Sequence, residues 1–385
     1  MIELHKVTLR LYPADVLMFR ETRYFGISAA DSKSGFPLPR TVAGAVRTYM
    51  LQACGADFRK LRALRTRRNA QPAETPEDGE GTDDALRQAC SNGSWAVDAA
   101  IQGPFLASSE GEGLRYYPMP RTIVRIGDDG ISSLKPVDEK AVSCWPEEVP
   151  RPLTSGSDKT CKHLDGYFID EATLKKYLEK GTAPLQKQVE NASSDQHFMP
   201  ETRVGVGISP TTLAAEEGLL YTSTFTRLEK KRALEVDVIL PGADAESALR
   251  TFTEQKPWLR LGGEGRVARV ELTKYRGALD APANGGRPLL YFATPAIFGG
   301  GHWKPHSISW GTRVVAAAVG SPRAFSGWDL SLDLPMPTRY GVPAGSVYFL
   351  EEPRWQSSDD PHGTCQSDSP REAAVGWGYC LRGVW

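Results

Sequence analysis

Short runs in which apolar and polar residues alternate recur along the chain and predict β-strands. In the run 5–12, Val7, Leu9 and Leu11 alternate with polar residues, which is the period of a strand with one buried face. The run 96–106 is a weaker candidate that leads to Gly103-Pro104. Strands are also predicted at 203–208, 219–228, 234–240, 268–272, 289–293, 312–318 and 346–350.

Helical spacing of apolar residues appears at three places. After Pro39-Arg40, Val42, Val46 and Tyr49 recur on one face, with Thr41 as the expected N-cap and Gly55 just past the end. A second helix is expected from Asp244 to just before Pro257, and a short one at 171–180.

The order of these elements is strand–helix–strand, followed by strand–helix–glycine loop–strand. This βαβ–βαβ order is the split ferredoxin-like pattern and predicts an α+β fold. We expect a domain at 1–277 with insertions at about 56–93 and 107–200, and a second, β-rich domain at 278–385.

Two adjacent segments of opposite charge interrupt the first unit. Residues 58–69 carry six basic side chains and no acid, whereas 74–84 carry six acids and no base. The basic segment is either a phosphate-binding helix or a solvated helix face neutralised by its neighbour. The acidic segment is expected to be an exposed flexible loop.

The charges of the whole chain nearly balance. Its 385 residues include 46 Lys and Arg against 47 Asp and Glu, a formal net charge of −1, which excludes a polybasic nucleic-acid coat. No secretory signal, no long apolar run and no C-x-x-C pair is present. We therefore expect a cytoplasmic protein with reduced thiols and no membrane span.

The loop 261–266 has the sequence LGGEGR and is the most distinctive local feature. Gly263, Gly265 and Ala268 match a loose dinucleotide-binding pattern, but a helix precedes the loop and a strand follows it, which is the reverse of what that site needs. The loop is either a tight turn or a place where a ligand backbone approaches glycine N–H groups, with Arg266 adding a phosphate contact.

Catalytic and metal-binding patterns are poor. Cys144, Cys161 and His163 fit no common zinc framework. His302 and His306 have no nucleophile or carboxylate close by in sequence. We expect no cofactor, no metal and no catalytic residue.

Taken in order, several segments resemble one family, the third subunit of the Cmr module, a RAMP protein of type III-B CRISPR effector complexes. The resemblance runs from about residue 7 to about residue 380, and 58–92 and 107–195 contribute little to it. The segments are MFRETRYFG at 18–26, FPLPRTVAGAVRT at 36–48, ETRVGVGI at 201–208, EGLLY at 217–221, LGGEGR at 261–266, ATPAIF at 293–298, PAGSVY at 343–348 and GWGY at 376–379.

The resemblance implies two ferredoxin-like (RRM-related) folds with a glycine-rich loop, and no catalysis. It implies that the chain holds the 5′ handle of the CRISPR RNA between the large palm-domain subunit and the first backbone RAMP subunit, and meets target RNA indirectly. No membrane partner is implied.

Matching motif positions then provide candidate RNA-binding residues. They are basic side chains, residues on the first turns of a helix, and glycines that allow a close backbone approach. The candidates are Arg20, Arg23, Thr41, Gly44, Arg47, Arg203, Gly262, Gly263, Gly265, Arg266, Gly300 and Lys304.

Three other functions stay open. A metal-independent repeat-RNA endonuclease of the RAMP type would need His302 or His5 as its acid or base. A pure scaffold would bind protein subunits alone. The chain would also suit the equivalent position in another type III subtype.

Overall fold

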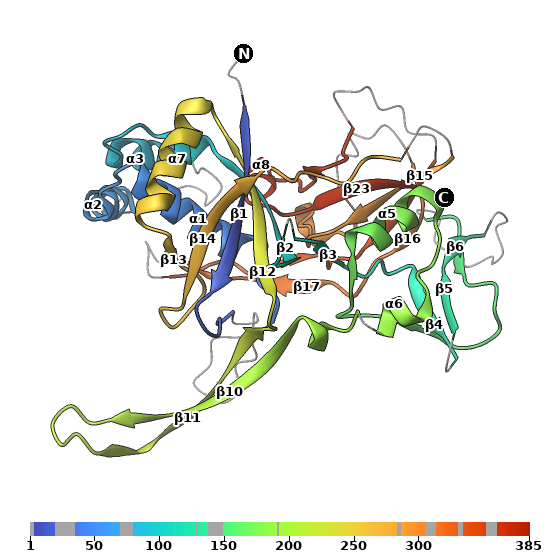
Figure 1. Cartoon of the computed structure of the whole chain (residues 1–385), viewed down its shortest axis with the longest axis horizontal. Coiled ribbons are helices and arrows are strands. Elements are labelled where there is room, and N and C mark those ends of the chain that lie inside the picture. The colour runs from blue at the N-terminus through green and yellow to red at the C-terminus, as the bar shows by residue number, and fades with distance from the viewer. Residues whose placement is uncertain are drawn as a thin grey trace.

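The computed structural model describes residues 4–19, 35–69, 80–111, 113–127, 130–137, 149–190, 192–282, 286–304, 313–329, 334–351 and 360–385. Two antiparallel sheets lie side by side, and a long two-stranded arm projects away from them (Figure 1). The α+β class predicted from the sequence is confirmed.

The first sheet has seven strands in the order β13-β14-β1-β12-β2-β3-β9. Leu9 of β1 lies opposite Val236 of β12 and Leu272 of β14, so apolar residues of neighbouring strands share one face. The bounds are β1 His5–Pro13, β2 Ala100–Ser108, β3 Arg115–Pro118, β9 Phe168–Asp170, β12 Arg232–Leu240, β13 Trp258–Arg260 and β14 Val267–Lys274.

Helices α1 (Pro39–Ala53) and α7 (Ala243–Gln255) cover the apolar face of this sheet, and Val46 and Leu249 share a core with Leu9. Helix α1 begins one turn earlier than predicted. Leu38 is its N-cap, and Thr41 is already helical, donating its N–H to the Leu38 carbonyl. Pro39 explains the shift, because its fixed φ suits the first helical position and it lacks the N–H that a cap would satisfy.

The predicted strand 96–106 is partly wrong, because helix α4 (Trp95–Asp98) occupies its start and β2 begins at Ala100. The prediction of a flexible loop for the acidic segment is also partly wrong. Its described residues 80–84 form the first turns of α3 (Glu80–Ala89), and the rest lies outside the described residues. The basic segment forms α2 (Phe58–Asn69), the helix that both of its interpretations required.

The second sheet has the order β16-β21-β15-β23-β22. Helix α5 (Glu171–Lys180) packs on it, with Tyr177 and Leu178 in one core with Tyr291 and Leu381. The bounds are β15 Pro288–Phe292, β16 Arg313–Ala318, β21 Val347–Glu351, β22 Thr364–Cys365 and β23 Tyr379–Val384.

The segment 107–200, expected as an irregular insertion, therefore joins the two sheets. Its strands β3 and β9 extend the first sheet, and α5 covers the second. The short helix predicted at 171–180 is confirmed, with Asp170 accepting the Thr173 N–H at 2.8 Å as its cap.

Smaller elements complete the fold, and no described helix is long and apolar enough to cross a membrane. The paired strands are β4 Ile123–Ile126 with β5 Gly130–Ser133 and β8 Cys161–His163, β6 Lys135–Pro136 with β7 Leu153–Thr154, β17 Arg323–Phe325 with β20 Arg339–Gly341, and β18 Trp328–Asp329 with β19 Leu334–Pro335. The short helices are α6 Gln186–Glu190, α8 Pro370–Ala373, η1 Ser194–Gln196 and η2 Gly299–Gly301.

The arm consists of β10 (Phe198–Ile208) and β11 (Ala215–Leu228), which pair antiparallel as the sequence predicted. Its register places Glu201 opposite Phe225 and Arg203 opposite Ser223. Figure 1 shows the arm leaving the body below the first sheet.

Candidate functional site

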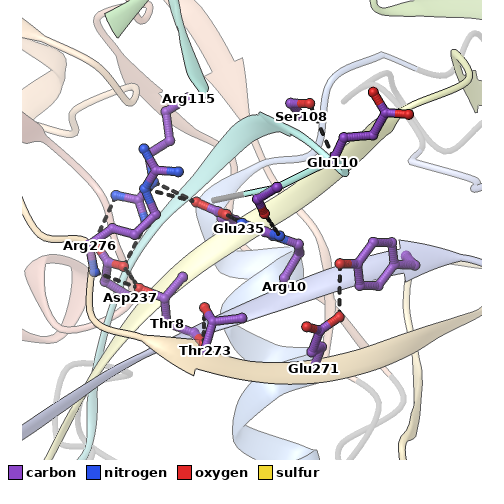
Figure 2. A network of polar contacts seen from close by, with 12 residues as sticks. Thr8, Arg10, Ser108, Glu110, Arg115, Glu235, Asp237, Glu271, Thr273 and Arg276 are labelled. Atoms are coloured by element: carbon purple, nitrogen blue, oxygen red, sulfur yellow. Dashed lines mark hydrogen bonds and ion pairs between the residues drawn. The ribbon is translucent and has the colours of Figure 1, made fainter. Parts of the chain in front are cut away.

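The face of the first sheet that points away from α1 and α7 is filled by a network of buried charges (Figure 2). Arg115 donates to Glu235 at 2.8 Å and to the two carboxylate oxygens of Asp237 at 2.9 and 2.6 Å. Arg10 donates to Glu235 at 2.9 Å, and Thr8 donates to Asp237 at 2.5 Å. All five side chains are buried.

This network closes the centre of that sheet face. Single-stranded RNA is commonly bound on an open sheet by stacking its bases on exposed aromatic residues. Here the carboxylates of Glu235 and Asp237 have no exposed surface. A nucleic-acid site on this unit must therefore lie elsewhere.

A second polar region lies where the arm meets the loop 261–266. The segment 14–19 runs between them. Leu17 exchanges two backbone hydrogen bonds of 2.8 Å with Thr226 of the arm, and the Met18 carbonyl accepts the Gly263 N–H at 2.9 Å. The segment thus holds the glycine loop beside the base of the arm.

Each glycine of the loop has a different role. Gly262 has φ +80°, and a Cβ there would lie 2.4 Å from the Met18 carbonyl oxygen. The N–H of Gly263 already serves Met18, so it is not available to a phosphate as the sequence suggested. Gly265 has φ +65°, and a Cβ there would meet nothing within 4 Å, which makes it the open side of the loop.

Three arginines converge on two carboxylates at this junction. Arg203 donates to Asp15 at 2.8 Å and to Glu201 at 2.7 Å. Arg227 donates to Asp15 at 2.8 Å and also to Glu201. The Nη1 of Arg266 lies 3.8 Å from the Oδ2 of Asp15. These five residues, called here the arginine cluster, carry one net positive charge.

The ring of Phe225 lies under the arginine cluster. The guanidinium carbons of Arg266 and Arg203 are 4.6 and 5.4 Å from its centroid, within the range of cation–π attraction. Among the described residues, the Nε of Arg266 is buried without a hydrogen-bond partner. The planar guanidinium groups are therefore held in place while remaining partly exposed.

Ion pairing keeps the two carboxylates of the cluster ionised. The hydrogen bond from Arg203, with that from Arg227, lowers the pKa of Asp15 to about 2. Arg227 and then Arg203 lower the pKa of Glu201. Arginine guanidinium groups suit bidentate contacts with phosphates, so the arrangement can bind a polyanion over a wide pH range.

The structure thus brings together Arg203, Gly262, Gly263, Gly265 and Arg266. The candidates on α1 are not part of the arginine cluster. Thr41 and Gly44 are exposed on α1, whereas Arg47 donates to the Ala99 carbonyl at 3.1 Å and supports the start of β2.

The remaining candidates lie elsewhere. Gly300 belongs to η2 in the second unit, and the Lys304 ammonium is 5.2 Å from the Trp303 ring centroid. Arg20 and Arg23 lie outside the described residues. The described residues on either side of that stretch approach the same place, because the Gly35 carbonyl accepts the hydroxyl of Thr226 at 3.1 Å.

Sequence reasoning missed Asp15, Glu201, Phe225 and Arg227. A signal for three of them exists, because Glu201 and Arg203 are two residues apart, as are Phe225 and Arg227. Paired strands present such residues on one face. Asp15 gave no local signal, because its partners follow it by 188 or more positions.

Other chemistry is not supported by the described residues. Among them no three His, Cys, Asp or Glu side chains gather as metal ligands, and Cys144 and His306 lie outside them. His302 and Trp303 both line a pocket of about 260 Å³. His5 is the first residue of β1, and its Nδ1 lies 3.1 Å from the Oε2 of Glu246.

The sequence model of a family described as "CRISPR-associated protein (Cas_Cmr3)" matches residues 9–385. This range contains the second sheet, the arm and all of the first sheet except the start of β1. No curated protein matches the chain.

The solved structures that match this chain include two chains of Cmr-beta complexes. A chain of "Type III-B Cmr-beta bound to cognate target RNA and AMPPnP, state 1" is 18% identical with a TM-score of 0.47, and the match covers 89% of this chain and 86% of that one. A chain of "Type III-B Cmr-beta bound to cognate target RNA" is 15% identical with a TM-score of 0.48, covering 90% and 86%. A "CRISPR associated protein Cas6" is 7% identical with a TM-score of 0.26, covering 74% and 100%.

Proposed function

The chain belongs to the CRISPR-associated Cas_Cmr3 family, and on that premise we propose that it is a non-catalytic subunit of a type III-B CRISPR ribonucleoprotein. In this role it binds the 5′ handle of the CRISPR RNA. The observation that carries the RNA contact is the arginine cluster, where Arg203, Arg227 and Arg266 surround Asp15 beside the glycine loop.

The handle would run across the arginine cluster and not across the sheet face. The middle of that face is closed, because the buried carboxylates of Glu235 and Asp237 are paired with Arg10 and Arg115. The open side of Gly265 leaves room for a backbone next to Arg266. Target RNA would be met indirectly, through pairing with the CRISPR RNA.

We propose that both sheets are ferredoxin-like. In the first, strand–helix–strand–strand–helix–strand is formed by β1, α1, β2, β12, α7 and β14, and these strands lie in the order β14-β1-β12-β2. In the second, β23-β15-β21-β16 repeats that order, with η2 and α8 in the helix positions and α5 covering the sheet. The domain boundary near 277/278 falls between β14 and β15.

The large palm-domain subunit and the first backbone RAMP subunit are the proposed protein partners. The arm suits an assembly because Val204, Ile208 and Leu220 are exposed apolar residues on a projecting element. Co-purification of the tagged chain with both subunits and CRISPR RNA tests this role. Recovery of the chain without either subunit would contradict it, and recovery with the subunits of another type III complex would change the subtype.

The RNA contact is tested by fluorescence anisotropy with RNA that carries the repeat-derived 5′ handle, over a series of salt concentrations. The Arg203→Gln/Arg227→Gln variant should bind more weakly, and the slope of log affinity against log salt should fall by about 1.4, because each lost phosphate contact contributes about 0.7. The control Lys230→Gln/Lys231→Gln removes two exposed charges from the turn between β11 and β12 and should retain the wild-type slope.

Two outcomes would contradict this function. Unchanged affinity and slope in the arginine variant would place the RNA elsewhere or leave a pure scaffold. Site-specific cleavage of repeat RNA that is lost in His302→Ala would show an endonuclease.

A further inference from the structure

Helix α2 is a concentrated positive charge in a nearly neutral chain. Its sequence FRKLRALRTRRN contains six basic residues and no acid, while the net charge of the chain is −1. Arginines occupy positions 59, 62, 65 and 68, so successive members of this row are about 4.5 Å apart along the helix axis.

The first half of α2 is firmly anchored. The Asp57 carboxylate accepts the N–H groups of Arg59 and Lys60 at 2.9 and 3.1 Å, as an N-cap does. Leu61 is buried against Ala85 and Ala89 of α3. This anchoring leaves Arg59, Lys60 and Arg62 on the exposed side of the helix.

Two acids of the neighbouring helix α3 act on arginines outside α2. Asp83 and Asp84 raise the pKa of Arg87, after its hydrogen bond with Asp98, and Asp83 also acts on Arg47. Lys60 donates to the Gln88 carbonyl at 2.7 Å, a neutral acceptor that leaves its charge in place. Like charges three positions apart destabilise a helix, and a bound polyanion would relieve that repulsion.

We propose that α2 binds the sugar–phosphate backbone of single-stranded RNA, as a surface additional to the arginine cluster. The inference rests on the proposed ribonucleoprotein function for its choice of RNA. Five of the six basic residues are arginines, whose planar guanidinium groups contact phosphates in bidentate fashion. Contacts of this kind read no bases, so the binding is independent of sequence.

The position of α2 suits the binding of RNA that extends beyond the arginine cluster. Figure 1 shows α2 and α3 at the outer edge of the first unit, beyond α1 and at the end of the molecule away from the second sheet. Helix α3 contacts α4 and α2 but belongs to neither sheet. The basic helix is therefore carried on an accessory layer.

The test uses the full chain and oligo(U) of about 20 nucleotides, which is longer than a typical single-strand site. The Arg59→Gln/Lys60→Gln/Arg62→Gln variant should lower the slope of log affinity against log salt by up to about 2, because three contacts at about 0.7 each are lost. The matched control Lys176→Gln/Lys180→Gln/Lys187→Gln removes three exposed lysines from α5 and α6 and should retain the wild-type slope.

Circular dichroism and the melting temperature should be the same for all three proteins, because the substituted side chains are exposed. No binding of oligo(U) by the wild type, or equal slopes for wild type and α2 variant, would overturn the inference. Wild-type RNA binding together with loss of a co-purifying protein subunit would overturn it in favour of an acidic protein partner.

The two proposals fail separately. If the Arg203→Gln/Arg227→Gln variant loses handle RNA while the α2 variant binds oligo(U) as the wild type does, the α2 surface alone is wrong. If the α2 variant loses oligo(U) while the arginine variant retains handle RNA, the proposed handle site is wrong.

Discussion

Gly262 shows how one residue without a side chain holds two segments together. Its φ of +80° lies in the left-handed region, and a Cβ would lie 2.4 Å from the carbonyl oxygen of Met18. Gly265, in the same loop, has φ +65° but open space around the position of a Cβ. The two glycines separate the cost of the backbone conformation from the cost of close contact.

We expect Gly262→Ala to destabilise the protein more than Gly265→Ala. The Gly265 variant meets only the strain of a left-handed residue, about 1–2 kcal/mol. The Gly262 variant meets that strain and must also displace Met18 from the Gly263 N–H. Melting temperatures of the two variants against the wild type measure this, and equal losses would show that the contact with Met18 does not matter.

His197 is a buried residue that should make stability depend on pH. Burial, and then the nearby charge of Arg232, lower the pKa of this imidazole to about 4. Its Nδ1 accepts from Arg232 at 3.0 Å, and its ring lies 4.7 Å from the ring of Tyr116. The folded protein therefore keeps His197 neutral where the unfolded chain, with a pKa near 6.5, takes up a proton.

The contribution of neutral His197 to the free energy of unfolding is fully present above pH 6.5. It is lost as the pH falls toward 4, by up to about 3 kcal/mol. The His197→Gln variant retains an acceptor for Arg232 and should lose less stability over that pH range. Urea unfolding at pH 7 and pH 4.5 measures the difference, with the exposed His163→Gln as control. An identical pH dependence in wild type and His197→Gln would exclude this histidine as the cause.

At the scale of elements, the β10–β11 arm has two unlike faces. Val204, Val206 and Leu220 share one face and are exposed along the outer part of the arm. The other face begins at the body with the arginine cluster and continues to Tyr221, whose ring covers Gly205. An isolated two-stranded ribbon is only marginally stable, so the base of the arm depends on its contacts with the segment 14–19.

Shortening the arm should therefore leave the body folded. Replacing residues 207–219 with Asn-Gly joins the paired residues Val206 and Leu220 by a two-residue hairpin turn. The melting temperature should stay within a few degrees of the wild type, because none of the removed side chains that the structure describes is buried. A large drop would show that the outer arm folds back on the body.

At the scale of the whole molecule, the segment 107–200 contributes to both sheets, and buried charges hold the linker between them against the first sheet. Arg115 lies on β3, its partners Glu235 and Asp237 lie on β12, and its Nη1 also donates to the Gly277 carbonyl between the sheets at 3.2 Å. Removing one partner from a buried ion network leaves uncompensated charges and is strongly destabilising.

Arg115→Met should cost about 3–5 kcal/mol of unfolding free energy. The control Arg87→Met breaks the exposed pair of Arg87 with Asp98 and should cost less than about 1 kcal/mol. Chemical denaturation of both variants measures the two costs. A small loss in Arg115→Met would mean that water reaches the network and replaces the arginine.

The sequence by itself determined most strands and helices, because the spacing of Val7, Leu9 and Leu11 or of the apolar residues in α1 is a local pattern. Arg203, Arg266 and the glycine loop were among the candidate RNA-binding residues taken from the sequence, which did not place them together. By the same rule of alternation, the polar residues within each strand were expected to face solvent. Thr8 and Arg10 are instead buried, because Asp237 accepts the Thr8 hydroxyl and Glu235 pairs with Arg10, both from more than 200 positions away.

Tertiary structure alone decided which polar residues meet. Asp15 joins Arg203 and Arg227 across about 200 positions, and segment 107–200 contributes α5 to a sheet formed by residues after 287. Alternation along a strand shows which residues share a face but not what covers that face. The covering segment is chosen by long-range packing and charge pairing, which leave no periodic trace in the sequence.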